Sequence, residues 1–177
     1  MIWDGLKNGV FQVFSSDHAP FRYAGTEGKR AAGVDAPFNL VPNGIPGLET
    51  RLPLLFSAGV MEGRIDINAF VALTSTNVAK MYGLYPRKGN VAVGADADLV
   101  IWNDTLEVAI TNAMLHHNVD YTPYEGQVLT AWPEITISRG KVVWSRPEAK
   151  AAKGRGEFLR CDRPQAAVPG CKSALAD

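Results

Sequence analysis

The spacing of apolar positions changes near residue 87, from a helical period before it to strand-like alternation after it. Over residues 48–60 apolar side chains recur three and four positions apart, which predicts a helix with one buried stripe: Leu52, Leu55, Phe56 and Val60. A second helix is predicted over residues 67–82, with Asp66 as its N-cap and Gly83 as its stop signal. Its expected buried stripe consists of Ile67, Phe70, Val71, Thr74, Val78 and Met81.

Strand-like segments lie on both sides of these helices. The apolar run over residues 10–16 is typical of a buried strand. Beyond residue 87, alternation predicts strands over 90–93, 98–102 and 107–111. A hairpin is predicted over residues 135–144, with Arg139-Gly140 as its tight turn. The chain therefore combines helices with a small antiparallel sheet.

A carboxylate and a long connection follow the first predicted strand. Asp17 stands at the mouth of that strand, where a barrel enzyme places a metal ligand or a general base. An aspartate there also serves as a turn residue or a helix cap, and the position alone leaves both interpretations open. Residues 19–47, rich in glycine, proline and charge, connect it to the next helix. Connections of this length are uncommon and usually functional.

Charge and composition narrow the class of protein. The 18 basic and 18 acidic side chains cancel, unlike the basic surface of a nucleic-acid or membrane-surface binder. No apolar run approaches the roughly 20 residues that span a bilayer. The two cysteines, Cys161 and Cys171, lack a Cys-x-x-Cys spacing and are typical of free thiols in a cytoplasmic protein. Because a core strand follows Met1 within ten residues, we expect the chain to be an internal piece of a larger protein.

Six stretches in one order resemble a known family. They are Ser-Asp-His-Ala-Pro-Phe at 16–21 and the runs at 42–53, 73–77, 85–89, 94–102 and 115–126. The Gly-Ala-Asp-Ala-Asp turn within 94–102 is similar to cyclic amidohydrolases in general. The Asn-Gly-Ile-Pro-Gly and Thr-Pro-Tyr-Glu-Gly runs resemble the dihydropyrimidinase and hydantoinase group within them.

The resemblance implies an α/β fold: the C-terminal portion of the (β/α)8 barrel of a metal-dependent hydrolase, plus part of a small β-sandwich. The barrel is expected to be incomplete, since such a barrel needs about 250 residues. Residues 1–86 would supply the last barrel strand, an active-site loop and the closing helices. Residues 87–146 would form the C-terminal half of a composite β-sandwich, and residues 147–177 an extended tail.

The same resemblance implies hydrolysis of a dihydropyrimidine or hydantoin ring, with two divalent metals, usually zinc, activating a hydroxide. Asp17 matches the family aspartate that binds one metal and moves the water proton onto the leaving nitrogen. Asn43 matches the position whose backbone groups bind the cyclic imide. Four histidines and a carboxylated lysine complete the family ligand set and are absent here, so the isolated chain is expected to be inactive. The implied partners are a small cyclic amide substrate and further copies of the protein in a homotetramer, and neither a nucleic acid nor a membrane is expected. The expected location is the cytoplasm.

The roles of the three histidines, and three other interpretations of the chain's function, are left open by the sequence. His18 is interpreted either as a residue supporting Asp17 or as a polar residue packed at the strand end. His116 and His117 are adjacent, so a strand would point them to opposite faces, which favours surface or domain-contact roles.

The chain also resembles the non-enzymatic collapsin response mediator proteins, although these lack the aspartate and the Asn-Gly-x-Pro-Gly run. An allantoinase or dihydroorotase, or a purely oligomerising scaffold segment, are the other interpretations.

Overall fold

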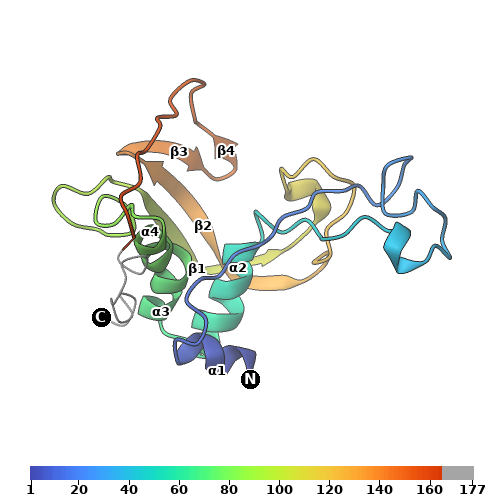
Figure 1. The fold of residues 1–177 in the computed structure, drawn as a ribbon, viewed down its shortest axis with the longest axis horizontal. Coiled ribbons are helices and arrows are strands. Elements are labelled where there is room, and N and C mark those ends of the chain that lie inside the picture. Colours follow the sequence, from blue (N-terminus) through green and yellow to red (C-terminus); the bar gives the residue numbers. More distant parts are fainter. Residues whose placement is uncertain (165–177) are drawn as a thin grey trace.

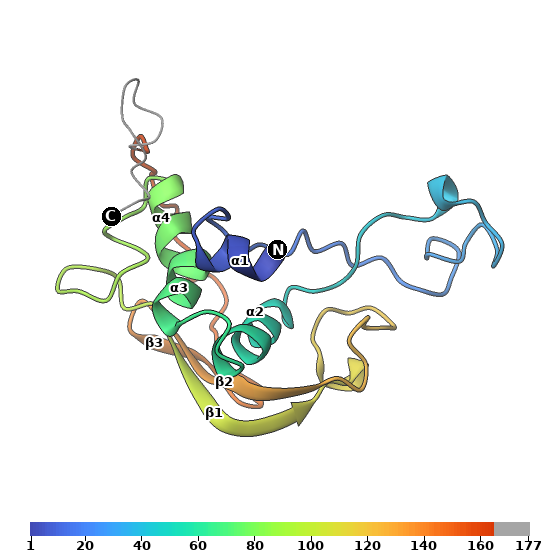
Figure 2. The same ribbon diagram turned by 90° about the horizontal axis from the view of Figure 1, so that it is seen from below.

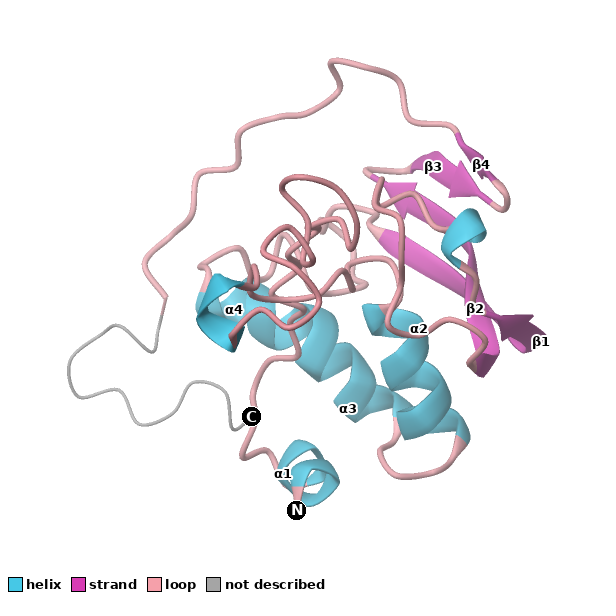
Figure 3. Cartoon of the chain, turned by 90° about the vertical axis from the view of Figure 1, so that its right-hand side faces the viewer, coloured by secondary structure: helices cyan, strands magenta, loops and turns pink. Residues whose placement is uncertain are grey.

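An antiparallel sheet with helices on one face forms the body of the molecule, and a long arm, residues 19–47, projects from it (Figure 1). The structure is a computed structural model, and it describes residues 1–164 of the 177-residue chain. Figure 3 shows helices α2, α3 and α4 on one side and the strands on the other. Within residues 1–164, no helix has the length and apolar character required to cross a bilayer.

The sheet runs in the order β1-β2-β3-β4, with all neighbours antiparallel. Strand β1 is Leu99–Ala109, β2 is Val128–Ser138, β3 is Lys141–Ser145 and β4 is Glu148–Ala149. The predicted hairpin is confirmed, and its turn has positive φ at both Arg139 and Gly140, as a two-residue hairpin turn requires. The segments predicted at 98–102 and 107–111 belong to one strand, whose pairing is irregular between Asn103 and Glu107.

The strand predicted at 90–93 is wrong. These residues belong to a loop in which Val91 and Val93 are exposed. Ion pairs from Lys88 to Asp96 and Asp98 close this loop, and Arg139 N donates to Asp98 Oδ1 over 2.8 Å. The Gly-Ala-Asp-Ala-Asp run therefore fastens the loop to the β2–β3 hairpin turn.

Both predicted central helices are present, and each contains π-helical turns. The first comprises α2 (Arg51–Leu55) and a π-helical segment (Phe56–Met61). The second comprises α3 (Ile67–Val71), a π-helical segment (Ala72–Thr76) and α4 (Asn77–Met81). Asp66 caps it as predicted, since its Oδ1 accepts a hydrogen bond from Ala69 N at 2.7 Å. A short 3-10 turn, Phe38–Leu40, lies far out on the arm, and another, Asn112–Met114, follows β1.

The buried face of the second helix differs from its predicted stripe. Phe70, Leu73 and Ala79 are buried, whereas Ile67, Val71 and Met81 are exposed. A π-helical turn takes more residues than an α-helical turn, so the wide turns at 72–76 rotate later residues such as Met81 away from a 3.6-residue stripe. Ile67 and Val71 precede these turns and lie in α3.

The N-terminal segment also departs from its prediction. Helix α1 (Ile2–Lys7) was not expected from the sequence. Residues 10–16 pair with no strand among the described residues, so their assignment as the last barrel strand stays a prediction. The segment runs along the helices: Phe14 N donates to Leu73 O at 3.0 Å, and Asn77 Nδ2 donates to Gln12 O at 2.9 Å.

Two apolar clusters join the helices to the sheet. In the larger one the Phe56 ring stacks on Trp102 of β1 at a centroid distance of 4.3 Å, and Phe70 meets both rings edge-on. Its buried members are Leu6, Leu55, Phe56, Ile65, Phe70, Leu73 and Ala131. The smaller cluster, near the base of the arm, contains Val108, Ile110, Leu129 and Trp132. Cys161 is exposed in the tail, whereas Cys171 lies outside the described residues.

Candidate active site at the base of the arm

Residues 19–47, called the arm here, leave the body and return to it, and Figures 1 and 2 both show them reaching far beyond the helices. The two ends of the arm meet at its base, where Ala19 N donates to Ile45 O at 3.1 Å. Asp120 holds the outgoing limb, since its two carboxylate oxygens accept from Tyr23 N at 2.6 Å and Ala24 N at 3.0 Å. These bonds lower the pKa of Asp120.

Asp17 lies immediately before the base of the arm. Its backbone is left-handed, with φ 45°, a conformation that aspartate tolerates better than most residues. Its side chain is exposed, and within residues 1–164 no hydrogen bond or ion pair involves its carboxylate. The carboxylate is therefore available to a ligand or a metal rather than committed to the fold.

The His18 side chain holds the end of the arm through hydrogen bonds. Its Nδ1 accepts hydrogen bonds from the backbone N–H groups of Gly47 at 3.0 Å and Leu48 at 3.2 Å. Nδ1 is therefore the ring nitrogen that acts as the acceptor. The His18 ring joins the segment that follows Asp17 to the end of the arm, and its part in any chemistry at Asp17 stays a prediction.

Asn43 lies on the returning limb of the arm, in the turn from Pro42 to Gly47, and is exposed. Lys29 Nζ donates to Pro42 O at 2.7 Å and to Gly44 O at 2.6 Å, on either side of Asn43. Gly44 has φ +81°, and a Cβ there would lie 2.5 Å from Ala19 Cβ. The structure thus brings the Asn43 turn against the residues that follow Asp17, far away in the sequence.

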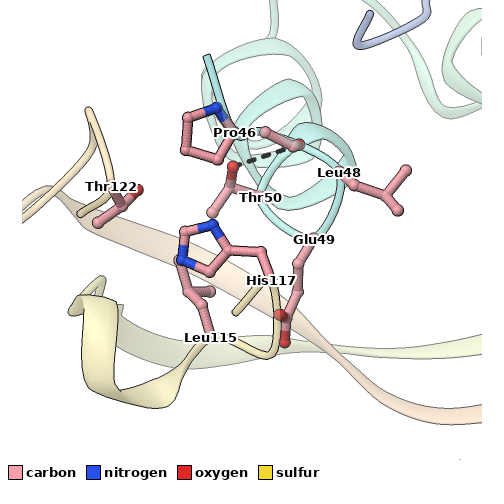
Figure 4. Close-up of a pocket in the computed structure, with 8 residues that line it drawn as sticks. Pro46, Leu48, Glu49, Thr50, Leu115, His117 and Thr122 are labelled. Atoms are coloured by element: carbon pink, nitrogen blue, oxygen red, sulfur yellow. Dashed lines mark hydrogen bonds between the residues drawn. The ribbon is translucent and has the colours of Figure 1, made fainter. Parts of the chain in front are cut away.

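A hollow lies beside this turn, between the start of the first central helix and the loop after β1 (Figure 4). The side chains of Thr50, Leu115 and His117 converge there, and the hollow has no room for a water molecule, so it is a packing junction rather than a substrate pocket. Its lining is Pro46, Gly47, Leu48, Glu49, Thr50, Leu115, His117 and Thr122.

Of the two adjacent histidines of this loop, His116 bonds to another segment, as predicted, whereas His117 bonds within the loop. His116 pairs with Glu49 through Nδ1 and Oε1 at 3.0 Å, and its ring meets Trp144 edge-on at 5.3 Å. His117 Nε2 contacts Asn112 Oδ1 at 2.8 Å. Burial lowers the pKa of His117, which favours its neutral form.

The described residues do not fit a two-metal centre by themselves. Within residues 1–164, no three side chains of His, Cys, Asp or Glu lie close enough together to hold a metal ion. Asp17 offers one oxygen ligand, and His18 uses Nδ1 for backbone donors. A catalytic zinc site takes three protein ligands, so any metal bound here needs ligands from outside these residues.

Comparison with known proteins identifies the family. A profile described as the amidohydrolase family matches residues 1–143. The chain belongs to the amidohydrolase family. This amidohydrolase is 41% identical over 160 residues to the D-hydantoinase of Geobacillus stearothermophilus, and 38% identical over 160 residues to that of Ralstonia pickettii. Each alignment covers 90% of this chain, but only 33% and 34% of the relative, so the chain spans about a third of the length of these curated relatives.

Solved structures of hydantoinases superpose on this chain over about a third of their own length. A crystal structure of a D-hydantoinase superposes with a TM-score of 0.84 at 38% identity, over 91% of this chain and 34% of that one. The D-hydantoinase (dihydropyrimidinase) from Thermus sp. gives 0.82 at 41% identity, over 90% and 34%. The L-hydantoinase (dihydropyrimidinase) from Arthrobacter aurescens gives 0.73 at 32% identity, over 85% and 32%. The family fold is of the (β/α)8 type, and this amidohydrolase shows a partial version of it with a small sheet.

Sequence reasoning did not find the residues that hold the arm. Lys29 stood out only as one charge in a polar loop, and Asp120 only as part of a matching run. Their partners are backbone groups 13 to 97 positions away, and a backbone donor or acceptor has no sequence signature.

Proposed function

We propose that the protein to which this chain belongs hydrolyses a cyclic amide, a hydantoin or dihydropyrimidine ring. The 41% identity to a D-hydantoinase over 90% of the chain supports the substrate class. One structural observation supports this location of the site. The hydrogen bonds that His18 and Ala19 form with the end of the arm hold the Asn43 turn beside the Asp17 segment. The whole reaction is a proposal because the chain spans about a third of its relatives.

We assign proton transfer to Asp17. Hydrolysis of the ring requires water to lose a proton as its oxygen attacks the carbonyl carbon, and the ring nitrogen must gain one as the C–N bond breaks. A single carboxylate oxygen can take the first proton and deliver the second. The exposed Asp17 carboxylate, without a partner among residues 1–164, suits this role.

Metal dependence is general in the amidohydrolase family, and we propose two divalent metals, zinc, for the whole protein. Bound metals would acidify a water molecule and polarise the carbonyl. Asp17 would supply one oxygen ligand, and the other ligands would come from outside the described residues. We therefore propose that the isolated chain binds zinc weakly and turns over no hydantoin.

We assign recognition of the ring to Asn43. Its backbone groups would bond to the N–H and C=O groups of the cyclic imide. The turn around it suits a flat ring, because Gly44 and Gly47 carry no Cβ that would keep the ring away. Lys29 occupies the neighbouring carbonyl oxygens of Pro42 and Gly44, which leaves the polar groups of Asn43 itself for a ligand.

A chimeric enzyme tests this proposal. The 160 aligned residues of this chain would replace their counterparts in the Geobacillus D-hydantoinase, and hydantoin hydrolysis would be measured. We expect an active chimera whose kcat falls about a thousandfold in Asp17→Asn, in line with loss of a general acid–base group. Asp35→Asn, which removes an exposed carboxylate of the arm, is the matched control and should leave kcat unchanged. An active Asp17→Asn chimera would refute the assignment.

The remaining expectations are part of the proposal. We propose a boundary near residue 87 between barrel and sandwich portions, a homotetrameric parent and a cytoplasmic location. The collapsin response mediator alternative is disfavoured by the presence of Asp17 and Asn43. Allantoinase and dihydroorotase are disfavoured because the relatives compared above are named hydantoinases. Assays of the full-length parent protein with each ring would separate the three cyclic amides.

A further inference from the structure

Lys29 occupies an unusual place in the arm. Its ammonium group lies between two backbone carbonyl oxygens, at 2.7 Å from Pro42 O and 2.6 Å from Gly44 O, and its side chain is half-buried. Within residues 1–164 it forms no ion pair with a carboxylate. Two of its three N–H donors are thus spent on the residues flanking Asn43.

The backbone of Lys29 is itself fixed. Lys29 N donates to Arg22 O at 2.8 Å, and Arg30 N donates to Tyr23 O at 3.1 Å. The preceding Gly28 is buried, and a Cβ there would lie 2.5 Å from Ala24 O. The base of the Lys29 side chain is therefore held by the outgoing limb, which Asp120 fastens to the body through Tyr23 and Ala24.

We propose that Lys29 is a positioning residue for ring recognition, an inference that rests on the proposed function. It links the outgoing limb of the arm to the turn that carries Asn43. By holding the carbonyl groups on both sides, it fixes the direction in which the backbone of Asn43 faces a ligand. Hydrogen bonds from a charged donor are stronger than those between neutral groups, so one side chain suffices to hold an exposed turn.

The neighbouring Arg30 provides the matched control. It carries the same charge in the same limb, but its guanidinium lies over the Tyr23 ring, 5.6 Å from the centroid, and it bonds to no carbonyl group of the turn. Replacement of either residue by methionine removes one positive charge and keeps a long side chain. Only Lys29→Met removes the two donors.

Amide hydrogen exchange of the full 177-residue chain, followed by NMR, tests the link directly. The reporters are the N–H groups of Ala19 and Gly47, which bond to Ile45 O and to His18 Nδ1. In Lys29→Met we expect both to exchange about tenfold faster, because two charge-assisted bonds no longer restrain the turn. In Arg30→Met the rates should stay within twofold of the parent chain, and Lys29→Arg should restore most of the protection because arginine also offers several donors. Unchanged exchange of both amides in Lys29→Met would overturn the proposal.

The chimeric enzyme supplies a second readout. A residue that only positions Asn43 should alter binding of the ring and not proton transfer, so Lys29→Met should raise KM about tenfold while kcat changes less than twofold. A fall in kcat with unchanged KM would overturn the positioning role. An inactive parent chimera would count against the proposed function alone, since the exchange experiment decides the Lys29 link without any activity.

Discussion

Substitution of Gly44 by alanine tests how closely the Asn43 turn packs on the Asp17 segment. Two features of the structure oppose a side chain at this position. The backbone has φ +81°, in the left-handed region that side chains disfavour, and a new Cβ would stand 2.5 Å from Ala19 Cβ. Carbon atoms in contact normally lie about 4 Å apart, so the two segments would have to separate by roughly 1.5 Å.

The cost of Gly44→Ala can be worked from these features. A left-handed conformation costs an alanine about 1–2 kcal/mol. Separation of the segments stretches the bond between Ala19 N and Ile45 O, now 3.1 Å, beyond a useful length and loses about 1 kcal/mol. The turn should therefore open more easily by about 2–3 kcal/mol, which corresponds to roughly 30- to 150-fold faster exchange of the Ala19 amide.

A double-mutant cycle separates the two contributions. Ala19→Gly removes the obstructing methyl group, so in the double variant Gly44→Ala should retain only its backbone cost, with a coupling energy of about 1 kcal/mol. Gly126→Ala is the control for backbone cost alone, because Gly126 has φ +78° and a Cβ there would meet no atom of residues 1–164 within 4 Å. Amide exchange by NMR measures each variant. Purely additive effects of the two substitutions, or unchanged Ala19 exchange in Gly44→Ala, would refute the packing argument.

Two further predictions concern the body and the base of the arm. Phe56→Ala should lower the free energy of unfolding by about 3–5 kcal/mol, because it removes the ring that stacks on Trp102. Val93→Ala is the control, since Val93 is fully exposed and its replacement should change the free energy of unfolding by less than about 0.5 kcal/mol. Urea denaturation measures both variants. Asp120 has a lowered pKa in the folded chain, so its hold on Tyr23 and Ala24 should be complete above about pH 4 and fade as the pH falls through that lowered value. Deuterium uptake by the outgoing limb of the arm should therefore be faster in Asp120→Ala at pH 6, and the difference from the parent chain should vanish near pH 2; a constant difference at all pH values would contradict this reasoning.

The sequence predicted those elements whose signals are local. The cap at Asp66 and the Arg139-Gly140 hairpin turn each depend on a few neighbouring residues, and both are confirmed. The strand predicted at 10–16 stays a prediction, because a strand needs a partner and residues 1–164 contain none for it. The exposed Met81 shows a different limit, since the π-helical turns before it change the period on which the stripe was based.

In the candidate site, too, the sequence identified residues that stand in motifs and missed those that act through distant partners. The motifs singled out Asp17 and Asn43, and the structure places their segments in contact through Ala19 and Ile45. Their chemical roles remain predictions. The support around them came from Lys29, whose partners are carbonyl groups that every residue carries. Only a folded backbone shows which of those groups a side chain reaches.

The left-handed backbone at Asp17 has an evolutionary consequence. The His18 imidazole holds the loop, whereas the Asp17 carboxylate bonds to nothing among residues 1–164, so the support of the loop and the chemistry proposed for Asp17 lie on separate, adjacent residues. A gene duplicate could exchange the acid for asparagine or glycine, which tolerate the same conformation, and keep an intact shell. Such a silent copy would be free to acquire a binding role, with no need to rebuild its architecture.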